Sequence, residues 1–148
     1  NFLYLLRRYV HQQDGEPGSR EIVGKLMQHP AWPRVKVDFD VVAKTHYGQE
    51  IYITGNHEAL GSWTRSGPGL KMNTTGGTYP LWKADTSIQL PFGLDLEFKV
   101  VKRDSRTGEL QWEPGDNQML LVDHADLNRD GADLHGGALG VNTRFRAP

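Results

Sequence analysis

The sequence predicts an all-β protein, an antiparallel β-sandwich of about seven or eight strands preceded by a short helical extension. Two observations predict this fold class. Several short runs alternate apolar with polar residues, which is typical of strands that bury one face. Clusters of Gly, Pro, Asn and Asp separate these runs, as turns separate short strands.

Residues 1–34 have a different pattern, and we expect them to be an N-terminal extension or linker that is partly helical. The segments NFLYLLRRYVHQQ and SREIVGKLMQHP each predict a short helix. The breaker cluster DGEPGS separates them, and Pro30 and Pro33 end the second. A helix that docks onto another part of the protein, or that mediates dimer contacts, is the alternative role for this extension.

From Val35 onward the apolar residues recur with a period of two, and we expect the sandwich to span residues 35–122. The first predicted strand is VKVDFDVV, with its valines at 35, 37 and 41 and Phe39 on one face. The further predicted strands are EIYIT (50–54), LWKADTSIQL (81–90), LDLEFKVVK (94–102), ELQWE (109–113) and QMLLV (118–122). Residues 123–148 are rich in Gly, Asp and Asn, so we expect a loop-rich C-terminal tail.

The composition argues against several classes of protein. A net charge of −1 argues against binding to nucleic acid, which usually requires a basic patch. The apolar run FLYLL is far shorter than the roughly 18 residues that a membrane span needs. The absence of cysteine excludes disulfides, thiolate metal sites and cysteine nucleophiles in this chain, and it weakly favours an intracellular location. Because the chain starts with Asn1 and has no signal-peptide pattern, we expect a piece of a longer protein.

Tryptophan, lysine and amide side chains are predicted to meet on one exposed surface. In LDLEFKVVK the outward positions include Glu97 and Lys99, while the next strand places Trp112 across a turn, followed by Asn117. The turn-rich segment GNHEALGSWTRSG (55–67) carries Trp63, which can join this surface from its loop. A sugar ring stacks its C–H face on an indole and takes hydrogen bonds at its hydroxyl edge, so these residue types favour carbohydrate binding.

The order of motifs supports this interpretation. HYGQEIYITGNHEALGSW, YPLWKADTSIQLPFGLDLEFKVVK and QWEPGDNQ together resemble the starch-binding domain of carbohydrate-binding module family 20, from about Val35 to Val122. The resemblance implies an immunoglobulin-like, open-sided sandwich that binds α-glucan at two surface sites and has no catalytic activity of its own. It also implies a covalently linked catalytic domain in a larger starch- or glycogen-active enzyme, such as a hydrolase, transferase, glucan phosphatase or phosphodiesterase.

The resemblance also assigns site residues. Trp63 and Trp112 match the two stacking tryptophans of the first site, and Lys99 and Asn117 match its polar partners. The second site would contain Tyr47, Gly48, Tyr79 and Trp82, with Glu97 as an acceptor. For Trp82 a core position is the alternative, because by strand parity it shares a face with apolar residues.

Other sites are weaker candidates. DLNRDG (126–131) begins like a calcium-binding loop, but Gly137 stands where the bidentate glutamate belongs and Asp133 where an apolar anchor belongs. His124 and His135 lack metal-ligand spacing, so we expect neither metal nor cofactor. Three acidic residues lie near the proposed sugar surface without singling out a catalytic pair, namely Glu97, Glu113 and Asp116.

We therefore expect a non-catalytic module that binds starch or glycogen-type α-1,4-glucans, maltooligosaccharides and cyclodextrins, and that tethers an enzyme to its polysaccharide. Two stacked rings at about 1–3 kcal/mol each, against an association cost of at least about 4 kcal/mol, predict weak to moderate affinity. A protein-interaction sandwich that uses the exposed tryptophans as anchors is the alternative function.

Overall fold

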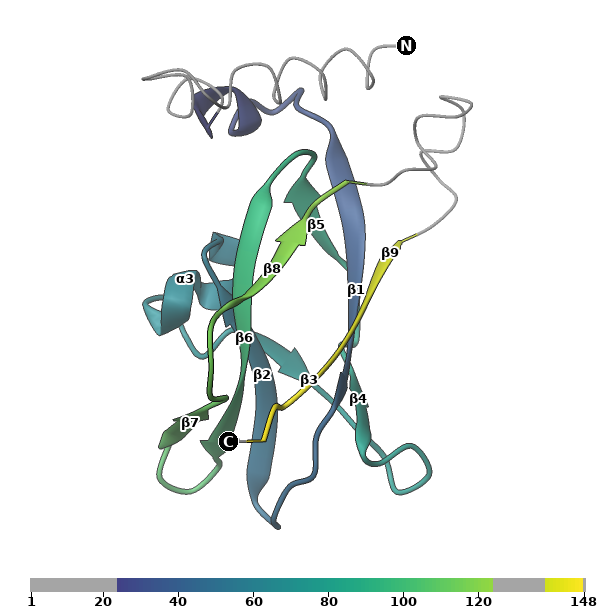
Figure 1. The fold of residues 1–148 in the computed structure, drawn as a ribbon, viewed down its shortest axis with the longest axis vertical. Helices are drawn as coiled ribbons and strands as arrows, with labels where there is room; N and C mark the ends of the chain where they lie inside the picture. Colours follow the sequence, from purple (N-terminus) through teal and green to yellow (C-terminus); the bar gives the residue numbers. More distant parts are fainter. Residues whose placement is uncertain (1–23, 124–137, 148) are drawn as a thin grey trace.

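The computed structural model describes residues 24–123 and 138–147, which form two β-sheets packed face to face (Figure 1). The predicted all-β sandwich is confirmed, and it does not close into a barrel. A small helical part is present at residues 24–27. Residues 28–30, which were predicted to belong to the second helix, form turns and a bend, and the rest of the two predicted helices lies outside the described residues.

The first sheet is built around β1 (Arg34–Val42). Along one edge, β1 pairs antiparallel with β4 (Leu81–Lys83) and β5 (Ile88–Pro91). Along its other edge it pairs in parallel with β9 (Leu139–Arg144), which runs beside it in Figure 1. β1 is thus the central strand that joins the C-terminal segment to the rest of the sandwich.

The second sheet has five strands and is centred on the long pairing of β2 (Gln49–Gly55) with β6 (Asp95–Asp104). The strand β3 (Leu70–Met72) lies on the free edge of β2. On the other edge of β6, β7 (Leu110–Trp112) pairs near the C-terminal end, and β8 (Gln118–Leu121) pairs near the start. Between β2 and β3 the chain forms two short turns, η1 (Glu58–Leu60) and α3 (Gly61–Thr64).

Apolar side chains from both sheets form one core. The alternating residues of β1 and β6 are buried as predicted, and Phe39 of β1 meets Phe98 of β6 edge to face with ring centroids 5.4 Å apart. Such contacts combine apolar burial with a favourable aromatic geometry. The period-two pattern therefore identified the inner faces of the two central strands correctly.

The run LWKADTSIQL forms two strands, so the prediction of a single strand was wrong. β4 pairs with residues at the end of β1, whereas β5 pairs with residues at its start. Between them the chain bends, and the Ser87 hydroxyl donates a hydrogen bond to the Asp38 carboxylate. The strand β3 was not predicted either, because its three residues are too few to show a period.

The expectation of a loop-rich tail is wrong for the strand β9. Its residues LGVNTR alternate between partly buried and exposed, with Leu139, Val141 and Thr143 on the inner face. Leu139, Val141 and the following Phe145 pack against the core. The surrounding Gly, Asp and Asn hid this short alternating run, and a parallel partner 102 residues earlier in the chain leaves no local turn signal.

The segment before β1 also packs against the sandwich. Trp32 is buried, and its indole N–H donates to the carbonyl oxygen of Phe92 over 2.8 Å. Phe92 in turn donates its backbone N–H to the carbonyl oxygen of Pro33. Within the described ranges, none of the helical segments has the length and apolar character that crossing a membrane would demand.

We expect Phe39→Ala to lower the free energy of unfolding by about 3–5 kcal/mol, because the fully buried ring fills the space between the sheets. Urea unfolding at equilibrium measures this loss. Val42→Ala is the matched control on the same strand, since Val42 is 47% exposed, and it should cost less than about 1 kcal/mol. Equal losses in the two variants would contradict the assignment of Phe39 to the core.

Candidate functional site

On the outer face of the second sheet, Trp112 lies beside two buried side chains of the neighbouring strands. Tyr52, Val101 and Trp112 lie side by side across β2, β6 and β7. Val101 lies on this outer face of β6, but its neighbours bury it completely. Trp112 remains 40% exposed. A large exposed indole on a rigid strand is available to a ligand at little cost in side-chain ordering.

Trp63 reaches the same face from the loop after β2. Its ring lies next to that of Trp112, with the centroids 6.5 Å apart and the ring planes inclined by 39°. The structure thus brings together the two tryptophans that the sequence predicted to act as a pair. Because the rings are inclined, they form an angled surface and not a flat strip.

An unusual backbone holds Trp63 in place. Ser62, Trp63 and Thr64 all have positive φ angles, of 47°, 57° and 72°. Such conformations are rare for residues with side chains and cost about 1–3 kcal/mol each, so they persist only where the surroundings enforce them. Strained backbone of this kind is frequent at functional sites, which makes the Trp63 loop a candidate for one.

Contacts between β2 and the two ends of the loop hold these residues in the left-handed conformation. Leu60 is fully buried, and its carbonyl oxygen accepts a hydrogen bond from the buried Thr54 hydroxyl over 3.1 Å. On the return side, Gly69 has a φ of 117°, and a Cβ there would lie 2.2 Å from the carbonyl oxygen of Ile53. Only glycine permits this close approach of the loop to β2.

Lys99 lies on β6 and contacts the turn 113–117, which follows Trp112. Its ammonium group donates to the carbonyl oxygens of Glu113 (3.2 Å) and Gly115 (2.5 Å). An ammonium group has three N–H donors, so within the described part of the chain a third remains for a ligand. Lys99 thus both holds the turn and keeps a donor for other partners.

Asn117 ends the same turn. Its side-chain amide donates to the Glu97 carboxylate over 3.3 Å, and both side chains are accessible. Together they offer a carbonyl oxygen, an amide N–H and carboxylate oxygens to a polar ligand.

The structure separates Glu97 from the other residues proposed for a second site. Gln49 pairs with Asp104 and Gly55 pairs with Phe98, so Tyr47 and Glu97 lie near opposite ends of the β2–β6 pair. At a rise of ~3.3 Å per residue this distance is about 20 Å. The structure therefore does not bring Glu97 together with Tyr47, because position along β6 decides which residues a side chain can contact.

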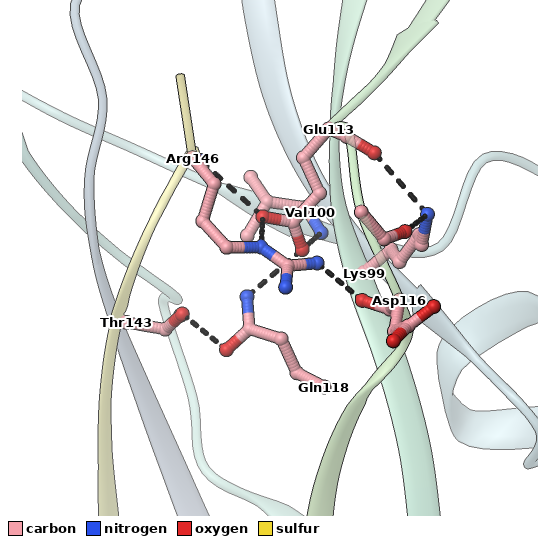
Figure 2. A network of polar contacts seen from close by, with 8 residues as sticks. Lys99, Val100, Glu113, Asp116, Gln118, Thr143 and Arg146 are labelled. Carbon is pink, nitrogen blue, oxygen red and sulfur yellow. Dashed lines mark hydrogen bonds and ion pairs between the residues drawn. The ribbon is translucent and has the colours of Figure 1, made fainter. Parts of the chain in front are cut away.

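A buried charge network supports the turn from below (Figure 2). The Glu113 side chain is fully buried, and one carboxylate oxygen accepts from the Val100 backbone N–H (2.9 Å) and from the Gln118 amide (2.8 Å). The other accepts from the backbone N–H (3.3 Å) and the Nε (3.0 Å) of Arg146. A buried carboxylate is stable only with such partners, and here they hold Glu113 at the start of the turn.

Arg146 was not among the residues predicted for the site. It lies just after β9, in the segment that was expected to be loop, and no local motif marks it. Its partner Glu113 follows Trp112 directly and was considered only as an acidic surface residue. Only the pairing of β9 with β1 brings the two together.

The other aromatic residues of the predicted second site lie around residues 43–48. Tyr47 is fully exposed. Gly48 adopts a φ of 90° in the turn before β2. Tyr79 is 43% exposed, and its hydroxyl accepts from the Thr45 backbone N–H over 2.8 Å, a hydrogen bond that lowers the pKa of the Tyr79 hydroxyl.

Trp82 differs from these two tyrosines because it belongs to the core. It is 7% exposed, and its indole N–H donates to the Ala43 carbonyl oxygen over 2.9 Å. The Tyr79 ring packs against it edge to face at 6.5 Å. This position agrees with the alternative of a mainly structural role.

A family model described as the starch binding domain matches residues 34–129. The chain belongs to the starch-binding domain family. The match covers more than half of the chain and includes every predicted site residue. It ends before β9, so the C-terminal strand of this starch-binding domain lies outside the matched residues.

Starch-active enzymes contain similar segments. The domain is 38% identical over 84 residues to an alpha-amylase from Streptomyces violaceus, covering 57% of this chain and 14% of that protein. It is 42% identical over 81 residues to a cyclomaltodextrin glucanotransferase from Geobacillus stearothermophilus, covering 54% of this chain and 11% of that protein. The fold also matches part of a glucoamylase from Hypocrea jecorina, with a TM-score of 0.62, 23% identity and coverage of 79% and 18%. The chain thus spans only a small part of these proteins.

No cluster of three or more His, Cys, Asp or Glu side chains is arranged to hold a metal ion in residues 24–123 and 138–147. The segment DLNRDG, with Asp133 and Gly137, and the histidines His124 and His135 lie outside these residues.

The loop that carries Trp63 should lose stability at acidic pH through His57. The Nδ1 atom of His57 accepts a hydrogen bond from the Ala59 backbone N–H over 3.1 Å, which requires a neutral ring. Burial lowers the pKa of His57 from its ordinary 6.5, with Arg34 adding to this effect and Glu58 opposing it. The unfolded chain keeps the higher pKa, so the stabilising contribution is complete above the ordinary pKa and is lost as the pH falls through the folded value.

His57→Asn is the matched variant, because asparagine also caps a helical turn but does not titrate. Between about pH 7.5 and about pH 5, the melting temperature of the wild type should fall further than that of His57→Asn. An NMR titration should place the pKa of His57 below 6.5. A normal or raised value, or equal losses in both proteins, would contradict this expectation.

Proposed function

We propose that this starch-binding domain binds α-1,4-glucan chains by stacking glucose rings on Trp63 and Trp112. The observation that carries the proposal is the inclined pair of accessible indoles, 6.5 Å apart, with Lys99 and Asn117 beside them. The apolar C–H faces of glucose pack on the indoles, while Lys99, Asn117 and Glu97 hydrogen-bond to hydroxyl groups.

The shape of the site favours a curved chain. Consecutive glucose units of an α-1,4-glucan turn relative to one another, and two rings that lie on indoles inclined by 39° follow such a turn. A flat row of coplanar aromatics would suit a straight polysaccharide instead. Starch and glycogen ends, maltooligosaccharides and cyclodextrins are the ligands with this curvature.

The Trp63 loop supports the proposal because it is preorganised. Its left-handed residues are enforced by the buried Leu60 and by the close packing of Gly69, so little conformational freedom is left to lose on binding. Two stacked rings should contribute about 1–3 kcal/mol each, against at least about 4 kcal/mol for association. The affinity is thus weak to moderate and depends on both tryptophans.

A second, weaker site is centred on Tyr47 and Tyr79. Both tyrosines are exposed, Gly48 allows the tight turn between Tyr47 and β2, and the hydroxyl of Tyr79 is fixed to Thr45. Trp82 supports Tyr79 from the core and offers a ligand little surface of its own. Glu97 acts at the first site with Asn117.

The biological role that follows is tethering. A weak surface site raises the local concentration of any enzyme to which the domain is joined. The alpha-amylase and glucanotransferase that contain similar segments are many times longer than the matched region, which supports a parent enzyme acting on starch or glycogen. Residues 1–34 are a candidate contact with that catalytic domain or with a second copy of the chain.

Isothermal titration with β-cyclodextrin tests the two sites separately. We expect the wild type to bind two ligands per chain, with Trp63→Ala and Trp112→Ala each weakening the first site by at least about tenfold. Tyr47→Ala should remove only the second, weaker event. The combined variant Trp112→Ala with Tyr47→Ala should give no saturable heat.

Two outcomes would overturn the proposal. A folded wild type that gives no heat would exclude α-glucan binding and favour a protein-interaction surface that uses the exposed Trp112 as an anchor. Release of reducing sugar from maltooligosaccharide by the isolated chain would show an enzyme.

A further inference from the structure

We propose that Arg146 is a positioning residue of the first glucan site, acting from outside the region that the family model matches. The inference rests on the proposed function of that site. Arg146 acts through the turn 113–117, which connects Trp112 to Asn117.

Arg146 holds two points of this turn at once (Figure 2). Its Nε donates to the Glu113 carboxylate over 3.0 Å, and one terminal nitrogen donates to the carbonyl oxygen of Asp116 over 2.5 Å. Glu113 begins the turn, and Asp116 directly precedes Asn117. A planar guanidinium group can bridge two such acceptors because its donors have a fixed fork geometry.

The turn needs an external support on this side. Gly115, at its centre, has a φ of 90°, a backbone conformation that an unsupported glycine leaves easily. The nearest atoms to a Cβ built on Gly115 belong to the Arg146 guanidinium, at 3.5–3.9 Å. From β6, Lys99 donates hydrogen bonds to the carbonyl oxygens of Glu113 and Gly115. From the segment after β9, Arg146 donates to the carbonyl oxygen of Asp116. Asn117 is fixed next to Glu97 only while both cations are in place.

The position of Arg146 depends in turn on β9. Phe145 donates its backbone N–H to the Val42 carbonyl oxygen over 3.0 Å, and the Lys102 ammonium lies 4.2 Å from its ring centroid. Thr143 donates to the Gln118 side chain over 2.6 Å, and Gln118 also contacts Glu113. The C-terminal strand of one sheet therefore sets the geometry of a binding turn on the other.

Three single variants test this inference by titration with β-cyclodextrin well below the melting temperature. Arg146→Lys keeps a charge near Glu113 but cannot reach both acceptors, so it should remain folded and still bind about tenfold more weakly at the first site. Arg146→Gln should weaken binding at least as much. Arg144→Gln removes an exposed arginine from β9 and should bind within about twofold of the wild type.

A double-mutant cycle separates positioning from general stability. Asn117→Ala should weaken binding about tenfold in the wild type but less than about threefold in Arg146→Lys, because Asn117 is already displaced there. The NMR signals of the Asn117 side-chain amide should shift in Arg146→Lys and not in Arg144→Gln.

The result that would overturn the inference is a folded Arg146→Lys that binds like the wild type, or effects of Arg146→Lys and Asn117→Ala that multiply independently. Absence of binding in the wild type would instead refute the proposed function. The second site, measured in the Trp112→Ala background where the first site is weakened, should be unaffected by any change at Arg146.

Discussion

The geometry of the binding face depends on one buried carboxylate. Glu113 has no access to solvent, and four hydrogen bonds from Val100, Gln118 and Arg146 compensate the loss of hydration. These partners come from β6, β8 and the segment after β9, so the charge is stable only when three distant parts of the chain have assembled. The same residue begins the turn that separates Trp112 from Asn117. The hydrogen bonds that stabilise the buried Glu113 carboxylate therefore also fix the turn between Trp112 and Asn117.

The second constraint is the strained loop on the other side of the tryptophan pair. Three successive left-handed residues are unfavourable, and the core has to offset that cost through Leu60, Thr54 and the close packing at Gly69. Both indoles are in this way held by rigid elements, one by a strand and one by an enforced loop. Under the proposed function such rigidity strengthens binding, because a site with few contacts gains too little interaction energy to offset a large loss of conformational freedom.

Much of the fold could be predicted because strand formation leaves a local trace. The alternation in β1 and β6 follows directly from the opposite orientation of successive side chains, and it identified the inner face of the core. The tryptophan pair was predictable as well, since one indole follows a strand pattern and the other stands among turn residues. The prediction failed where a strand was too short to show a period, as in β3, or where one run served two pairings, as in β4 and β5.

By itself, the sequence determined which segments become strands, which face of each is apolar, and which aromatic and polar residue types are available to a sugar. These are local properties, fixed by side-chain periodicity and turn chemistry. Only the tertiary structure decided that Glu97 meets Asn117 and not Tyr47, that Trp82 is buried, and that Arg146 supports the turn next to Trp112. The reason is physical: strand register and the parallel pairing of β9 with β1 depend on contacts between residues far apart in the chain, and no local pattern encodes them.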